Sequence, residues 1–235
     1  MEPNFVRIYK QFPAAAEYLS SIYLITRDYG YVTNVRLAEW MGVSSSAVTQ
    51  ALERLRRLGL VHRKRYENVL LSEAGRTLSL QVLRRHYLLE HLLVRLLDYP
   101  WDKADEEAKR LQTQISEDLA DHLYSKLGGP QTCPHGNPMP GSRLEHRLLT
   151  APNLSQAPLG EVVRILRVTE EGEQVPTMLA FCFKHGLRPG ASFQILAKGK
   201  RTLHLQRSRV SGDSKAKASV SLPLDLAEHI RYEVA

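Results

Sequence analysis

Apolar residues recur at helical spacing over most of the first ninety residues of the chain, and two short alternating runs interrupt this pattern. The spacing of three to four residues predicts helices over Ala14–Arg27, Val35–Met41 and Ala47–Leu58. Leu60–Arg63 and Asn68–Leu71 alternate like two short strands. A helix, a turn, a second helix and then a hairpin predict a winged helix-turn-helix in this part of the chain.

The two central helices of this motif divide into an apolar and a polar face. Leu37 and Met41 of the first are expected to pack against Val48 and Leu52 of the second. The opposite face, at the start of the second helix, is then left to short polar side chains. These residues are Ser44, Ser45, Ser46, Thr49 and Gln50.

Such side chains suit DNA. Serine hydroxyls at a helix N-terminus match phosphate oxygens, Gln50 can pair with adenine, and Thr49 can contact a thymine methyl group. Arg63, Lys64 and Arg65 fall at the predicted tip of the wing, where they suit backbone phosphates. The alternative is a helical hairpin without a nucleic-acid role, and the basic wing favours DNA.

The pattern changes further along the chain. Thr77–Leu97 and Ala104–Leu127 carry leucine-rich stripes that predict two long amphipathic helices and a dimer interface. Gly128–Pro158 is rich in Pro, Gly and Asn and indicates a loop and linker. After it, apolar residues alternate with period two, which predicts a small β-rich domain with a short helix at Thr177–His185.

Charge supports an anionic partner. The 235 residues carry a formal net charge of +7, and Arg36–Arg65 alone holds seven basic and two acidic residues. Two cysteines make no disulfide framework, and no apolar run reaches the roughly 18 residues of a membrane helix, so we expect a cytoplasmic protein without a membrane partner. The chain has no phosphate loop, nucleophile elbow or zinc-protease motif, so no enzyme is expected.

Several strings of residues resemble one family over nearly the whole chain. The chain is similar to the metal-dependent repressors named for the diphtheria toxin repressor and the manganese transport regulator, with the SH3-like (FeoA-type) domain of its longer members at the C-terminus. The strings that carry this resemblance are Glu17–Tyr23, Leu37–Glu39, Val43–Thr49, Leu58–Val61, Leu71–Gly75, Arg85–Glu90, Cys133–Pro138, Pro140–Gly141, Gly186–Gly190 and Leu226–Ile230.

The resemblance implies three domains: a winged helix-turn-helix at 1–76, a helical dimerisation and metal-binding domain at 77–150, and a small all-β SH3-like barrel at 158–235. It implies a homodimeric, cytoplasmic transcriptional repressor of metal-ion homeostasis that binds an interrupted palindromic operator in double-stranded DNA. Mn²⁺ or Fe²⁺ would bind between the DNA-binding and dimerisation domains.

The resemblance also assigns metal ligands. One site falls on His86 and Glu90, one helical turn apart, together with Asp105. Without the resemblance, this spacing of His86 and Glu90 is more typical of a surface pair than of a metal site. The other site would use Glu17 and a stretch that here reads Glu107–Thr113. In that stretch Lys109, Gln112 and Thr113 replace the expected ligands, which are Cys or Glu, Glu and His.

These departures leave an alternative open, namely the same fold with a response that is independent of metal or that depends on an effector other than a metal. In that hypothesis the ammonium of Lys109 stands in for the metal and pairs with Glu17. Two other candidate groups are interpreted as structural. Glu170, Glu171, Glu173 and Gln174 indicate a solvated acidic turn, and Cys133 with His135 has no second pair at zinc spacing.

Overall fold

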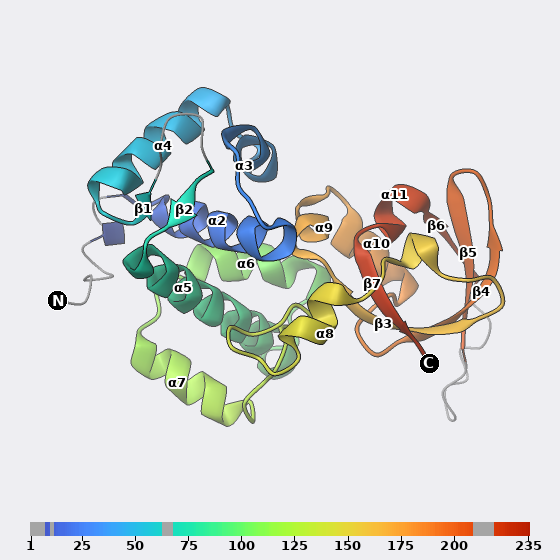
Figure 1. Ribbon diagram of the computed structural model, residues 1–235. Coiled ribbons are helices and arrows are strands. Elements are labelled where there is room, and N and C mark those ends of the chain that lie inside the picture. The colour runs from blue at the N-terminus through green and yellow to red at the C-terminus, as the bar shows by residue number, and fades with distance from the viewer. Residues whose placement is uncertain (1–7, 10–11, 63–67, 209–218) are drawn as a thin grey trace. The chain divides into compact units, whose positions relative to one another are not determined.

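The computed structural model describes residues 8–9, 12–62, 68–208 and 219–235 (Figure 1). The chain forms two compact units. Three helices contribute to both units, namely α5 (Glu73–His91), α6 (Ala104–Leu111) and α7 (Glu117–Lys126). Unit 1 comprises Met1–His86 and Arg110–Asp121, and unit 2 comprises Tyr87–Lys109 and His122–Ala235. No helix of the described residues combines the length and the apolar composition that crossing a membrane requires.

Unit 1 contains the winged helix-turn-helix, and the first three helices of this unit lie close to the ranges predicted for them. Two antiparallel strands pair Val61 with Leu71 and His62 with Leu70 to form the base of the wing. Buried side chains of the first three helices and of the wing share one apolar core. In chain order the elements are α2 (Ala15–Tyr29), α3 (Asn34–Met41), α4 (Ser45–Arg57), β1 (Val61–His62), β2 (Leu70–Leu71) and α5 (Glu73–His91).

Short polar side chains and a glycine position the ends of these helices. Thr33 caps α3 by accepting a hydrogen bond from the Arg36 amide at 3.2 Å. Between the wing and α5, the Ser72 hydroxyl donates to the Gly59 carbonyl at 2.7 Å. A Cβ atom at Gly75 would lie 2.0 Å from the Leu60 carbonyl oxygen, so only glycine lets the first turn of α5 lie against the wing.

Unit 2 combines short helices with a five-stranded antiparallel sheet in the order β6-β5-β4-β3-β7, which confirms the small SH3-like β domain. Alternate strand residues such as Val163, Ile165, Phe193, Leu203 and Leu205 are fully buried, as the period-two pattern predicts. The strands are β3 (Val162–Val168), β4 (Ser192–Lys198), β5 (Thr202–Arg207), β6 (Ser219–Pro223) and β7 (Ile230–Val234).

The remaining elements are mostly short. α5 continues into a π-helical turn, η1 (Leu92–Leu96). The others are η2 (Trp101–Lys103), α6 (Ala104–Leu111), α7 (Glu117–Lys126), α8 (Glu145–Thr150), η3 (Leu154–Gln156), α9 (Glu170–Gln174), α10 (Met178–His185) and α11 (Leu224–Ala227).

Two predicted stretches were wrong. The single helix Ala104–Leu127 is interrupted after Leu111, because the Ser116 hydroxyl accepts a hydrogen bond from the Leu119 amide at 3.1 Å and so starts α7. The predicted linker Gly128–Pro158 contains α8 and η3. It also contains fully buried residues, so much of it is part of the core of unit 2.

Candidate functional site

The N-terminal half of α4 presents the predicted DNA-reading residues together. Val48, Leu52 and Leu55 of this helix are fully buried, so the helix is fixed by its apolar face. The five predicted DNA-contacting residues lie on its exposed side, in the first turns. They are Ser44, Ser45, Ser46, Thr49 and Gln50.

Hydrogen bonds within unit 1 already employ three of these side chains, and the Ser44 and Ser46 hydroxyls share one of these bonds at 2.9 Å. The Ser44 hydroxyl caps α4 by accepting from the Ala47 amide at 3.2 Å. The Thr49 hydroxyl donates to the Ser45 carbonyl at 2.9 Å and accepts from the Asn34 amide group at 3.1 Å. These bonds orient the Thr49 methyl group, and they leave the exposed amide of Gln50 as the longest polar side chain on this face.

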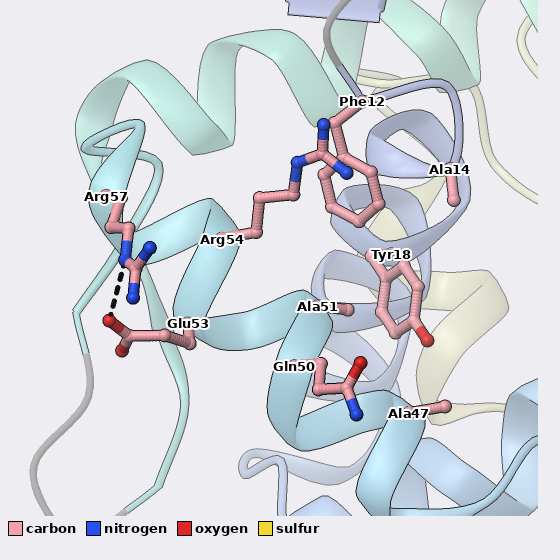
Figure 2. Close-up of a pocket in the computed structure, with 9 residues that line it drawn as sticks. All are labelled: Phe12, Ala14, Tyr18, Ala47, Gln50, Ala51, Glu53, Arg54 and Arg57. Atoms are coloured by element: carbon pink, nitrogen blue, oxygen red, sulfur yellow. Dashed lines mark hydrogen bonds and ion pairs between the residues drawn. The ribbon is translucent and has the colours of Figure 1, made fainter.

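A groove of about 610 Å³ follows the flank of α4 (Figure 2). The Arg54 guanidinium lies over the Phe12 ring, 4.7 Å from its centroid, and Glu53 holds Arg57 at 3.0 Å. Figure 2 shows Gln50 on α4 and Tyr18 on α2, with the Tyr18 hydroxyl pointing toward the end of the groove where Gln50 and Ala47 lie. The groove is lined by Phe12, Ala14, Tyr18, Ala47, Gln50, Ala51, Glu53, Arg54 and Arg57.

The predicted tip of the wing lies outside the described residues. Arg63, Lys64 and Arg65 belong to 63–67, between β1 and β2. Their contact with backbone phosphates therefore stays a prediction.

A second group of chemically active side chains is buried in unit 2, on a tight turn. The Gly136 amide donates to the Cys133 carbonyl at 3.0 Å, and the Cys133 amide donates to the Asn137 carbonyl at 2.8 Å. Gly136 has a φ of +94°, and a Cβ there would lie 2.2 Å from the Leu166 carbonyl oxygen. Glycine at this position therefore allows the turn to pack directly on β3.

This turn places Cys133 and His135 beside Glu90 of α5. One ligand atom from each of the three residues lies within 4.8 Å of the other two, and all three residues are buried. His135 Nδ1 is 3.2 Å from a Glu90 carboxylate oxygen and 3.8 Å from a carboxylate oxygen of Glu173, whose side chain is 1% exposed. Thiol, imidazole and carboxylate groups at these separations form a donor set for a divalent transition metal.

His135 is held in one orientation from its other side. Its Nε2 donates to the Trp101 carbonyl at 3.0 Å, and the two rings lie 4.4 Å apart. A hydrogen bond of this kind fixes the ring of a metal-binding histidine and directs the remaining nitrogen at the ion. His135 therefore presents Nδ1 to Glu90 and Glu173.

Burial and neighbouring charges set the protonation of this group. Burial lowers the pKa of His135, but Glu90 and Glu173 outweigh it and raise the pKa to about 10. Burial, assisted by the charge of Glu90, raises the pKa of the Cys133 thiol well above its usual value. Burial also raises the pKa of Glu173 well above its usual value, although His135 opposes this shift. Without a metal, the group therefore holds protons that a divalent cation would displace.

A polar network fixes α9 to the turn. The Asn137 amide group donates to the Val168 carbonyl at 2.9 Å and to the Glu173 carboxylate at 2.6 Å. Arg167, which is 2% exposed, donates to the Asn137 side-chain oxygen at 2.8 Å. The prediction of a solvated acidic turn is wrong for Glu170 and Glu173, because this network and the Tyr87 hydroxyl, which donates to Glu170, bury both carboxylates.

The ligands that the resemblance implied are placed as follows. His86 and Glu90 are one turn apart on α5, both buried, with ligand atoms within 4.8 Å of each other. Carboxylate oxygens of Glu90 and Asp105 also lie within 4.8 Å. Glu17 is exposed on α2. The Lys109 ammonium has partners within its own unit, Asp105 and Gln174. Its pairing with Glu17, which belongs to the other unit, stays a prediction.

Comparison with known proteins identifies the family. A model described as the N-terminal DNA-binding domain of iron-dependent repressors matches residues 12–69. A second model, described as the metal-binding and dimerisation domain of iron-dependent repressors, matches residues 72–141. The chain belongs to the iron-dependent repressor family.

Curated relatives and solved structures of this family are similar to the chain. The iron-dependent repressor IdeR of Mycobacterium bovis is 36% identical over 124 residues, 53% of this chain and 54% of that protein. The diphtheria toxin repressor of Corynebacterium diphtheriae is 32% identical over 53% of this chain and 55% of its own length. These matches span about half the length of each relative. A manganese-dependent transcriptional repressor in complex with manganese is 28% identical, with a TM-score of 0.76 over 94% of this chain and 100% of that chain.

The sequence pattern did not predict that Cys133, His135 and Glu173 lie together. The interpretation of Cys133 and His135 as loop structure relied on the lack of a second ligand pair nearby in the sequence. The structure supplies that pair from α5 and α9, 43 and 40 residues away from Cys133. The available signal was the Cys-Pro-His-Gly string itself, since its glycine permits a tight turn.

Proposed function

We propose that the chain is a divalent-cation-responsive transcriptional repressor that binds double-stranded DNA as a homodimer, in the cytoplasm and without enzymatic activity. In this proposal residues 1–76 bind an interrupted palindromic operator, residues 77–150 dimerise and supply metal ligands, and residues 158–235 form the SH3-like domain. The effector is Fe²⁺ or Mn²⁺, the metals named for the relatives.

The main support for the proposal is the buried donor set of Glu90, Cys133 and His135. The same chain contains α4, the helix proposed to read DNA. The residues fit a divalent transition metal. Glu90 and Glu173 both face His135 in a group that is closed to water, and a bound cation would offset their repulsion. This fit favours the metal-responsive function over a metal-independent one.

The donor set is linked to the wing through α5. This helix starts two residues after β2 and carries Glu90 at its C-terminal end. When bound, the cation supplies a positive charge that neutralises the buried carboxylates. Glu90 at the end of α5 and Cys133 and His135 of the turn would hold the ion, with Glu173 of α9 beside them, so that the ion would join segments whose carboxylates repel one another without it.

DNA binding with and without the ion tests this function. Fluorescence anisotropy of a labelled duplex from the region upstream of the chain's own coding sequence is measured with Mn²⁺ and with a chelator. We expect Mn²⁺ to raise the affinity at least about tenfold, and the chelator to reverse the gain. Affinity that neither addition changes would rule out a metal-responsive repressor, and absence of DNA binding would rule out the whole proposal.

Gln50 is proposed to read a base within the operator. Gln50→Ala should weaken the free energy of DNA binding by about 1–3 kcal/mol at the preferred sequence, because it removes a bidentate contact to adenine. The difference in affinity between matched and mutated operators should become smaller for the same reason. Competition binding with a set of mutated duplexes measures this difference. Gln194→Ala, at an exposed glutamine of β4, is the control and should leave it unchanged. Undiminished discrimination in Gln50→Ala would show that this side chain reads no base.

The affinity for the cation should rise with pH. His135, with a pKa of about 10, and Cys133, with its raised pKa, are both protonated near neutrality and must lose protons to bind a metal. Raising the pH makes that loss easier, so affinity should increase roughly tenfold per pH unit for each proton released. Mn²⁺ titrations at several pH values around neutrality measure the slope, and a flat profile would contradict the assigned ligands.

A further inference from the structure

Lys109 places a positive charge next to the proposed metal centre. Its ammonium donates to an Asp105 carboxylate oxygen at 2.7 Å and to the Gln174 side-chain oxygen at 3.3 Å. The lysine side chain is 35% exposed, whereas the Asp105 side chain is 8% exposed. The ammonium thus links α6 to the end of α9, the helix that carries Glu170 and Glu173.

The surroundings keep this lysine charged. Burial lowers the pKa of Lys109, but the charge and the hydrogen bond of Asp105, helped by Glu173 and Glu170, raise it above its usual value overall. Buried carboxylates therefore surround two cationic side chains in this region, the ammonium of Lys109 and the ring of His135. His135 lies at the Cys133 end of the region, and Lys109 lies at the Asp105 end.

The oxygens that hold Lys109 are of the kind that hold a metal. A carboxylate and a side-chain amide oxygen are common ligands of hard divalent cations, with water completing the coordination. An ammonium on the same oxygens excludes such an ion, because it occupies the donors and adds a like charge. Since the ammonium is covalently tethered, it has a high local concentration that a free ion must overcome.

We propose that the Lys109 ammonium is a resident cation that fills a second cation position at Asp105 and Gln174. Unit 2 then takes up one divalent ion per chain, at the Glu90, Cys133 and His135 centre. The inference rests on the proposed metal-binding function and adds to it that the second position is closed to divalent ions by this side chain.

Metal stoichiometry of the full-length protein tests this. The metal-free chain, Lys109→Met and Lys109→Gln are each dialysed to equilibrium against Mn²⁺, and bound metal is measured. We expect one ion per chain in the unaltered protein and two in both variants, since each variant removes the ammonium that occupies the Asp105 and Gln174 oxygens. Circular dichroism establishes that the variants are folded, and the two variants provide independent readings.

Two control variants separate charge from other effects. Lys109→Arg retains a cation and should bind one ion. Lys103→Met removes an exposed lysine of η2 and should also bind one ion. One ion of unchanged affinity in both charge-removing variants would overturn the inference alone. Absence of binding in every protein, the unaltered chain included, would instead overturn the proposed function.

Discussion

Gly136→Ala is expected to abolish high-affinity cation binding. A Cβ at this position would lie 2.2 Å from the Leu166 carbonyl oxygen and 2.7 Å from the Arg167 Cα. Both are backbone atoms of β3, which cannot move away without disturbing the strand. The turn would have to move off β3, where the His135 carbonyl accepts from the Val168 amide at 3.0 Å. Cys133 and His135 would move with it, so the affinity for Mn²⁺ should fall on the order of 100-fold or more.

Gly141→Ala is the matched control for this variant. Gly141 also has a positive φ, +75°, but a Cβ there meets no atom within 4 Å. The variant Gly141→Ala should lower the free energy of unfolding by about 1–2 kcal/mol and leave the affinity for Mn²⁺ unchanged. Calorimetric Mn²⁺ titration and thermal unfolding of both variants make the comparison. Equal affinities for Mn²⁺ in the two variants would show that the turn does not position the ligands.

Glu90→Gln should also remove cation binding, with a loss of affinity on the order of 100-fold. Glu90 is fully buried and faces His135 Nδ1 at 3.2 Å, so its carboxylate is proposed to bind the ion directly. The amide of glutamine has the size of the carboxylate but no charge. The charge of Glu90 is also the largest cause that raises the pKa of His135 against the effect of burial, so Glu90→Gln should lower this pKa. Calorimetric titration with Mn²⁺ measures the affinity.

Glu106→Gln makes the same change at an exposed position of α6 and should bind Mn²⁺ as the unaltered chain does. Adding Mn²⁺ should raise the affinity for DNA in Glu106→Gln, as in the unaltered chain, and should leave it unchanged in Glu90→Gln. A Glu90→Gln variant whose DNA affinity still rises with Mn²⁺ would show that residues other than Glu90 bind the metal.

The DNA-binding unit was predictable because its signals are local. Helical periodicity, the Thr33 and Ser44 caps and the ending glycines each act within one turn of the chain, and the helices α2, α3 and α4 formed close to where these signals place them. The break between α6 and α7 was missed because the apolar stripe continues across it. Ser116, a residue that favours helix starts, was the available signal.

The metal centre was only partly predictable, because its residues come from segments far apart in the sequence. Glu90 could be named from the resemblance, whereas Cys133 and His135 have no ligand partner within their own stretch. Their partners are brought to them by the packing of the turn on β3 and by the Asn137 network that places Glu173. The pairing of Lys109 with Asp105 follows helical spacing, but its contact with Gln174 depends on the same packing.

Cobalt absorption reports directly on whether Cys133 binds the metal, because a cobalt–thiolate bond gives an intense near-ultraviolet charge-transfer band and a carboxylate site does not. Metal-free protein is titrated with Co²⁺, and Cys133→Ser is titrated in parallel. Cys182 is the other cysteine of the chain and lies buried in the core of the β domain, so it stays as an internal control. We expect a saturable band at one Co²⁺ per chain that Cys133→Ser lacks. A band that persists in Cys133→Ser, or Co²⁺ binding without any band in the unaltered chain, would contradict this expectation.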